Sequence, residues 1–386
     1  MSRDAIPPPH RKPVDPDLLD QARPGHGIPS QDPDPAAQMP LAPADAQREG
    51  ESTLTGGGMV AGAATGAAIG IAIGGPAGVV VGATLGAVAG ALGGAAAGAA
   101  THQEPPGDPA TPSQTEVHIH VDDHGGAGRP VVLIHGWPLS SEAWAPQVSA
   151  LLAAGHRVIA CDRRGFGRSD KPASGYDYDT LAGDLQRVME SRDLRDVTLV
   201  GFSMGGGEVA RFIARFGESR LRSVVFAAAV TPCLLKTADN PEGPLTPEEA
   251  RQKKAALAQD RDAFFDAFTR NFFSAHGKPQ VTQAQRAEAI ALCLQSAPHA
   301  ALACMDAFST TDFRADLKRV TVPTLVIHGD ADAIVPLEAS GERTHRAISH
   351  SQMVVIRGAP HGLNLSHAQA FNDALLTFLR TAPQPR

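Results

Sequence analysis

From residue 130 onward, the chain alternates short, continuous apolar runs with amphipathic stretches. The apolar runs predict strands at 131–134, 158–161, 197–200, 224–226, 324–327 and 353–356. Because these runs do not alternate with polar residues, they are typical of strands buried on both faces of a parallel sheet. The amphipathic stretches predict helices at 141–153, 179–192, 206–217 and 367–380. This rhythm predicts an α/β fold with a doubly wound, mostly parallel sheet, in a domain that spans residues 115–386.

Residues 231–310 interrupt the rhythm, because they are helical in character and contain no clear strand. In a doubly wound fold, an insertion at this point lies over the carboxyl ends of the strands, where ligands bind. We therefore expect a helical cap over a binding site.

The first hundred residues follow other patterns. Residues 1–50 hold 11 of the 31 prolines and show no helical or strand period, which predicts disorder. In residues 51–104, glycine recurs at every fourth position from Gly58 to Gly98 among small apolar residues. That spacing predicts a glycine-zipper helical hairpin whose two helices approach closely and are separated at Gly74-Gly75-Pro76.

The hairpin resembles the glycine-zipper transmembrane hairpins of bacterial membrane-associated proteins. The resemblance implies that residues 56–100 associate with a membrane. The alternatives are a soluble segment that self-associates, which would make the protein a homo-oligomer, and a flexible, low-complexity Ala/Gly run. Residues 105–114 read as a proline-rich linker.

Charge and cysteine content narrow the function classes. The chain has 34 Lys and Arg against 41 Asp and Glu, a net charge of −7, which argues against a nucleic-acid binder. Its four cysteines are far apart and form no metal-binding spacing, so we expect them to be reduced and mostly buried. The amino terminus lacks the pattern of a signal peptide. We expect a cytoplasmic protein, with the zipper hairpin as a means of attachment to the inner membrane.

A candidate nucleophile follows the third predicted strand. Ser203 lies at the centre of Gly201-Phe202-Ser203-Met204-Gly205, a G-x-S-x-G sequence between a strand and a helix. The flanking glycines permit the cramped turn that exposes a serine hydroxyl, and the amides of the next helix point toward it.

A serine needs a base and an acid, which in this arrangement follow in the order Ser, Asp, His. The segment HGDADAIVP after strand 324–327 offers Asp330 or Asp332, and GAPHGL after strand 353–356 offers His361. The loop after strand 131–134, HGWP, and the residue after the serine are expected to supply an oxyanion hole through the amides of Trp137 and Met204.

Six motifs now carry a family resemblance. They are HGWPLSSEAW at 135–144, DRRGFGRSDKP at 162–172, GYDYDT at 175–180, GFSMGGGEVARF at 201–212, HGDADAIVP at 328–336 and GAPHGL at 358–363. In order and spacing they resemble the α/β-hydrolase superfamily, and within it the branch of cofactor-free, non-heme haloperoxidases and aryl esterases. The resemblance implies Ser203 as nucleophile and His361 as general base, and its acid spacing selects Asp332.

The resemblance implies a serine hydrolase that acts on small carboxylic esters through an acyl-enzyme and needs neither a metal nor a cofactor. Hydrogen peroxide in place of water would give a peracid that oxidises halide. In the family, a proline after the loop tryptophan is associated with this perhydrolysis, and Pro138 occupies that place. We expect Pro138, Phe202, Phe264 and Phe268 in the substrate pocket, although the last two could instead pack the cap against the core.

Two alternatives remain open from the sequence. The first is a lactonase or a C–C bond hydrolase of the same fold, because the cap and not the triad selects among these substrates. The second is a membrane or assembly protein whose functional part is the zipper and whose hydrolase domain is a passenger.

Overall fold

The computed structural model describes residues 117–382. The predicted disordered region, glycine-zipper hairpin and linker lie outside the described residues and stay predictions. Among residues 117–382, no helix is long and apolar enough to cross a membrane.

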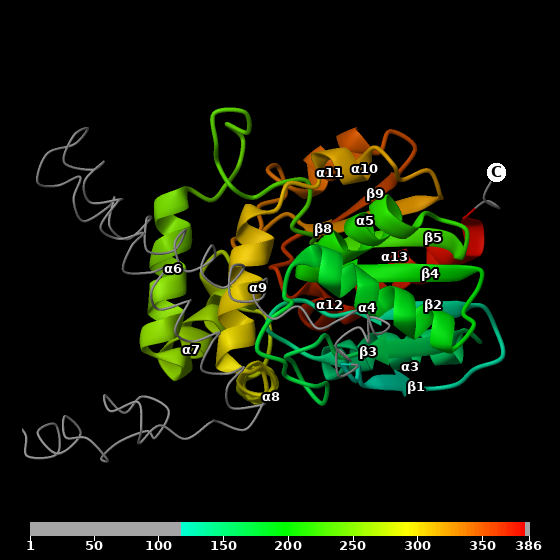
Figure 1. Cartoon of the computed structure of the whole chain (residues 1–386), viewed down its shortest axis with the longest axis horizontal. Coiled ribbons are helices and arrows are strands. Elements are labelled where there is room, and N and C mark those ends of the chain that lie inside the picture. Colours follow the sequence, from blue (N-terminus) through cyan, green and yellow to red (C-terminus); the bar gives the residue numbers. More distant parts are fainter. Residues whose placement is uncertain (1–116, 383–386) are drawn as a thin grey trace, which may run out of the picture. The chain divides into compact units, whose positions relative to one another are not determined.

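A seven-stranded sheet forms the centre of the fold (Figure 1). Its strands are β1 (Val121–Asp123), β2 (Pro130–Ile134), β3 (Arg157–Cys161), β4 (Val197–Phe202), β5 (Leu221–Ala227), β8 (Thr324–Gly329) and β9 (Gln352–Ile356). They lie side by side in the order β1-β3-β2-β4-β5-β8-β9. Only the edge strand β1 is antiparallel to its neighbour, and the remaining pairs are parallel. Each of the six apolar runs lies within one of these strands, which confirms the predicted α/β fold.

Helices cover both faces of this sheet. They are η2 (Ser141–Trp144), α3 (Ala145–Ala153), α4 (Tyr178–Ser191), α5 (Met204–Phe216), α10 (Arg314–Leu317), α11 (Gly341–Ala347), α12 (Leu363–Ser366) and α13 (Ala368–Thr381). Helices α4 and α5 pack against each other on one face, and α3 and α13 pack against each other on the other (Figure 1). Because both faces are covered, every residue of β4, β5 and β8 is buried, as their continuous apolar sequences predicted.

The insertion between β5 and β8 is mainly helical and stands apart from the sheet in Figure 1. It contains α6 (Pro247–Gln259), α7 (Arg261–Phe272), α8 (Gln283–Leu294) and α9 (Pro298–Thr310). Thr246 and Thr282 form capping boxes at the starts of α6 and α8, which satisfies the first free amides of both helices. A hairpin of two short antiparallel strands, β6 (Ser274–Ala275) and β7 (Lys278–Pro279), follows α7. The sequence predicted no strand in this insertion.

A buried ion pair fixes the turn that follows β3. The Arg164 guanidinium donates from Nε to Asp184 Oδ2 at 2.5 Å and from Nη2 to Oδ1 at 2.6 Å. Both side chains are less than a tenth exposed, and the two parallel bonds orient the charges rigidly. The pair ties this turn to α4.

Replacement of Asp184 by alanine should therefore destabilise the protein strongly. The buried guanidinium of Arg164 would lose its counter-charge, which typically lowers the free energy of unfolding by about 3–5 kcal/mol. Urea unfolding measures the loss. As a matched control, Asp306→Ala breaks an exposed pair with Lys254 and should change the free energy by less than about 1 kcal/mol. Equal losses in the two variants would show that the buried Arg164–Asp184 pair contributes no more to the free energy of unfolding than an exposed pair does.

Candidate active site

Ser203 lies in the sharp turn between β4 and α5. Its backbone has φ 53° and ψ −116°, a conformation that residues with a side chain rarely adopt. The turn requires glycine at neighbouring positions, because a Cβ on Gly201 would lie 2.4 Å from the Gly205 oxygen. A Cβ on Gly205 would lie 2.5 Å from the Ile134 oxygen. The serine thus occupies the N-cap of α5, where the helix dipole favours negative charge.

Three side chains from separate loops meet at this turn. His361, in the loop after β9, lies with Nε2 2.9 Å from Ser203 Oγ. Its Nδ1 lies 2.6 Å from Oδ2 of Asp332, in the loop after β8. Because a carboxylate accepts hydrogen bonds, Nδ1 carries the hydrogen and Nε2 is free to accept the serine hydroxyl proton. The arrangement can therefore activate Ser203 as a nucleophile.

Asp332 is fully buried and held by several donors. Its Oδ1 accepts the backbone amides of Ile334 at 2.9 Å and Val335 at 2.8 Å. Burial alone would raise the pKa of this carboxyl, but the charge of His361 and the hydrogen bonds from His328 and His361 outweigh burial and hold the pKa well below its usual value. Asp332 is therefore ionised at neutral pH and can stabilise a protonated imidazole.

The other candidate acid, Asp330, has a different role. Its side chain is exposed and accepts the backbone amide of Gly358 at 2.6 Å. It braces the loop that precedes His361 but does not reach the imidazole. The structure thus brings Asp332, and not Asp330, to His361.

The loop after β2 lies directly beside the nucleophile. A Cβ on Gly136 would lie 3.1 Å from Ser203 Cβ and 2.7 Å from the Phe202 ring, so this approach requires glycine. Within residues 117–382, the amide of Trp137 donates no backbone hydrogen bond. Met204 is the first residue of α5 and has no acceptor inside that helix. Both amides are therefore available to an oxyanion formed at Ser203.

A cavity of about 440 Å³ opens onto Ser203 and His361. Its walls are mainly apolar and include Trp137, Phe264, Phe268, Met305 and Phe308. The indole of Trp137 is fixed by a hydrogen bond from Nε1 to the Ala301 oxygen at 3.0 Å. Phe264 and Phe268 meet it edge to face, at centroid distances of 6.2 and 5.4 Å. The site suits a small, largely apolar substrate.

Two expected pocket residues do not line this cavity, and these expectations are corrected. Phe202 is 1 % exposed, and its ring packs against Trp144, Phe272 and the His361 imidazole. It therefore supports the histidine from behind instead of facing substrate. Pro138 is also buried and lies outside the lining, because the indole of Trp137 forms the wall at this point.

Within residues 117–382, no cluster of three or more His, Cys, Asp or Glu side chains is arranged to hold a metal ion. The four cysteines are buried and form no disulfide.

Comparison with known proteins agrees with this geometry. The alpha/beta hydrolase fold family matches residues 129–368. The chain belongs to this family.

Relatives of the hydrolase include haloperoxidases and esterases. A non-heme chloroperoxidase of Kitasatospora aureofaciens is 41% identical over 70% of this chain and 99% of its own. A bifunctional esterase/perhydrolase of Acinetobacter calcoaceticus is 36% identical over 69% of this chain and 97% of its own. The crystal structure of a bromoperoxidase from Bacillus anthracis matches with a TM-score of 0.68 and 51% identity, over 69% of this chain and 97% of that chain. The predicted relationship to this branch of the α/β-hydrolases is confirmed.

Sequence reasoning missed a second histidine beside the acid of this hydrolase. His328 is fully buried, with Nε2 2.9 Å from the Val335 oxygen and 3.3 Å from Asp332 Oδ2. Both neighbours accept hydrogen bonds, so Nε2 carries the hydrogen. His328 thereby holds the turn whose amides bind Asp332. Its spacing of four residues from Asp332 in HGDAD was the available sequence signal.

A buried network beneath the oxyanion loop was also missed. The amide of Arg163 donates to His135 Nε2 at 2.9 Å, and its guanidinium donates to the His135 oxygen at 2.7 Å and to Glu208 Oε1 at 2.5 Å. Glu208 lies on α5, so the network ties the loop after β2 to the helix that begins at the nucleophile. Burial, reinforced by the charge of Arg163, lowers the pKa of His135 to about 3.

This buried, neutral histidine should make the stability of the hydrolase depend on pH. Below the unfolded pKa of about 6.5, the unfolded chain binds a proton at His135 that the folded chain takes up only near pH 3. Stability is therefore lost as the pH falls through this range. The difference in free energy of unfolding between wild type and His135→Gln should shift by about 1.4 kcal/mol per pH unit, to the disadvantage of wild type. Urea unfolding at pH 6, 5 and 4 measures this slope; a difference independent of pH would contradict it.

Proposed function

We propose that this protein is a serine hydrolase that cleaves small carboxylic esters through an acyl-enzyme. The observation that carries the proposal is the chain of hydrogen bonds from Asp332 through His361 to Ser203, at the floor of an apolar cavity. Its relatives, named as haloperoxidases and as an esterase/perhydrolase, support the same reaction class.

In the first half of the reaction, Ser203 Oγ attacks the ester carbonyl while His361 Nε2 takes the hydroxyl proton. Negative charge then develops on the carbonyl oxygen, where the amides of Trp137 and Met204 donate to it. Asp332 stabilises the imidazolium that forms. His361 next protonates the leaving alcohol, and the acyl group stays on Ser203.

In the second half, a nucleophile releases the acyl group. His361 removes a proton from water, the hydroxide attacks the acyl carbon, and the proton returns to Ser203 as the carboxylic acid leaves. Hydrogen peroxide can take the place of water in this step, and the product is then a peracid. A peracid transfers its terminal oxygen, with the proton, to a halide ion, which gives a hypohalous acid and the carboxylate. Pro138 fixes the backbone after Trp137, and we assign it the role of presenting the Trp137 carbonyl to peroxide.

The test is ester hydrolysis by the full chain. Wild type should hydrolyse para-nitrophenyl acetate, and Ser203→Ala should lower kcat/KM by at least about a thousandfold, because the covalent route is lost. The Ser203→Ala variant should remain folded, as circular dichroism would show. Ester hydrolysis that survives this substitution would refute the proposed mechanism.

The same assay tests perhydrolysis. Added hydrogen peroxide should divert acetyl groups from acetic acid to peracetic acid in wild type, and Ser203→Ala should form neither product. Peracid formation that is independent of Ser203 would show that peroxide does not act on the acyl-enzyme.

A further inference from the structure

The wall of the cavity includes part of the segment between β5 and α6, besides residues of α7 and α9. Leu234, Pro244 and Leu245 of this segment line the cavity. The beginning and the end of the segment form its two arms, which pair through backbone hydrogen bonds. The amide of Leu245 donates to the Leu234 oxygen at 3.0 Å, and the amide of Lys236 donates to the Leu245 oxygen at 2.7 Å. We name residues 233–245 the wall loop.

Asn240, at the far end of the wall loop, is 1 % exposed although it lies on no helix or strand. Its Nδ2 donates to the Leu235 oxygen at 2.6 Å and to the Cys233 oxygen at 3.2 Å. Gly243 lies against this amide, since a Cβ there would be 2.7 Å from Nδ2 and 2.5 Å from the Leu235 oxygen. The asparagine therefore folds the tip of the loop back onto its first arm.

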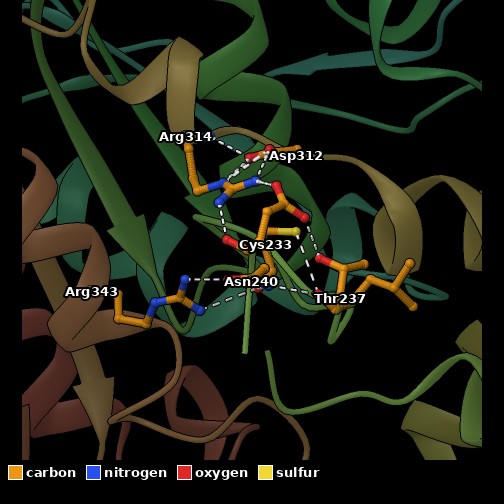
Figure 2. A network of polar contacts seen from close by, with 8 residues as sticks. Cys233, Thr237, Asn240, Asp312, Arg314 and Arg343 are labelled. Carbon is orange, nitrogen blue, oxygen red and sulfur yellow. Dashed lines mark hydrogen bonds and ion pairs between the residues drawn. The ribbon is translucent and has the colours of Figure 1, made fainter. Parts of the chain in front are cut away.

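Two arginines from helices that cover the sheet bind this folded tip (Figure 2). Arg343 of α11 donates from Nη2 to Asn240 Oδ1 at 2.5 Å and also reaches the Cys233 oxygen, at 3.5 Å. Arg314, the first residue of α10, donates to the Asp239 oxygen at 2.8 Å and to its Oδ2 at 2.5 Å. Figure 2 shows the two guanidinium groups reaching the loop from different sides.

These contacts anchor the wall loop to α10 and α11 and not to the cap helices. Helix α11 packs on β8, the strand that precedes the loop of Asp332. The wall loop and the catalytic acid are therefore both held by the packing of α11 on β8. The side chain of Asn240 is buried with each of its amide atoms paired, and such a network is rigid as long as it is complete. Leu234 and Leu245 are thus held at a fixed position in the cavity.

We propose that Asn240 is a positioning residue that sets the size of ester the cavity accepts. It fixes the wall formed by Leu234 and Leu245 through its bond to Arg343, while Arg314 holds the neighbouring Asp239. The proposal rests on the proposed ester hydrolysis and adds the determinant of its specificity. Removal of the Asn240 side chain removes the amide group that joins the carbonyl oxygens of Cys233 and Leu235 to Arg343. The wall then yields to a bulky substrate, whereas a small substrate does not press on it.

The experiment compares para-nitrophenyl acetate with the bulkier para-nitrophenyl benzoate, using the full chain. Wild type should prefer the acetate. In Asn240→Ala, KM for the benzoate should fall so that the preference drops about tenfold, a change of about 1.4 kcal/mol. The kcat for the acetate should stay within about twofold, because the triad is untouched. A loss of folded protein alone would lower the rates for both esters equally and leave their ratio unchanged.

Two further variants make the test decisive if Asn240→Ala folds poorly. Arg314→Gln removes the bonds to Asp239, the neighbour of Asn240, and should shift the preference in the same direction by a smaller factor. Arg319→Gln is the matched control, since Arg319 donates to the Ala214 oxygen, away from the loop, and it should leave the preference unchanged. An unaltered preference in folded Asn240→Ala or Arg314→Gln would overturn the inference while ester hydrolysis stands. Absence of any Ser203-dependent hydrolysis in wild type would overturn the proposed function and the inference together.

Discussion

The backbone turn at Ser203 is the constraint on which the site depends. The serine adopts a positive φ, and the turn closes only because Gly201 and Gly205 leave their Cβ positions empty. The space at Gly205 is filled by the carbonyl of Ile134, the last residue of β2. The turn is therefore built into the packing of β2 against β4 and α5. The loop after β2 consequently lies beside the serine, because Gly136 of this loop packs directly against Ser203.

Buried charge imposes the second requirement, because each charged group around this turn needs partners. Asp332 receives two backbone amides and the His361 ring, while the Arg163 guanidinium lies between the loop after β2 and Glu208 of α5. These contacts cross between elements that are distant in sequence, and they hold the catalytic loops at fixed positions. The same need for partners applies to the buried, uncharged amide of Asn240 in the wall loop, at the edge of the cavity. Polar pairing thus organises both the proposed chemistry and its proposed specificity.

The parts of this protein that could be predicted from sequence are those with local signals. Continuous apolar runs marked the buried strands, and G-x-S-x-G marked the turn because its steric demand falls on adjacent residues. The pocket was harder to predict, since the orientation of Phe202 depends on the packing of Trp144 and Phe272 around it. The bond between Asn240 and Arg343 joins residues 103 positions apart, and no local pattern indicates such a pair. Whether Asp330 or Asp332 lies beside His361 likewise depends on the course of two loops.

The most direct test of the central claim is to identify the residue that becomes covalently modified. The full chain would be treated with an aryl fluorophosphonate, which reacts with an activated serine and mimics the tetrahedral intermediate, and the adduct would be located by peptide mass spectrometry. The account predicts one adduct per chain, on Ser203, with none in Ser203→Ala and much slower labelling in His361→Ala. Wild type that stays unlabelled, or that is labelled at another residue, would contradict it.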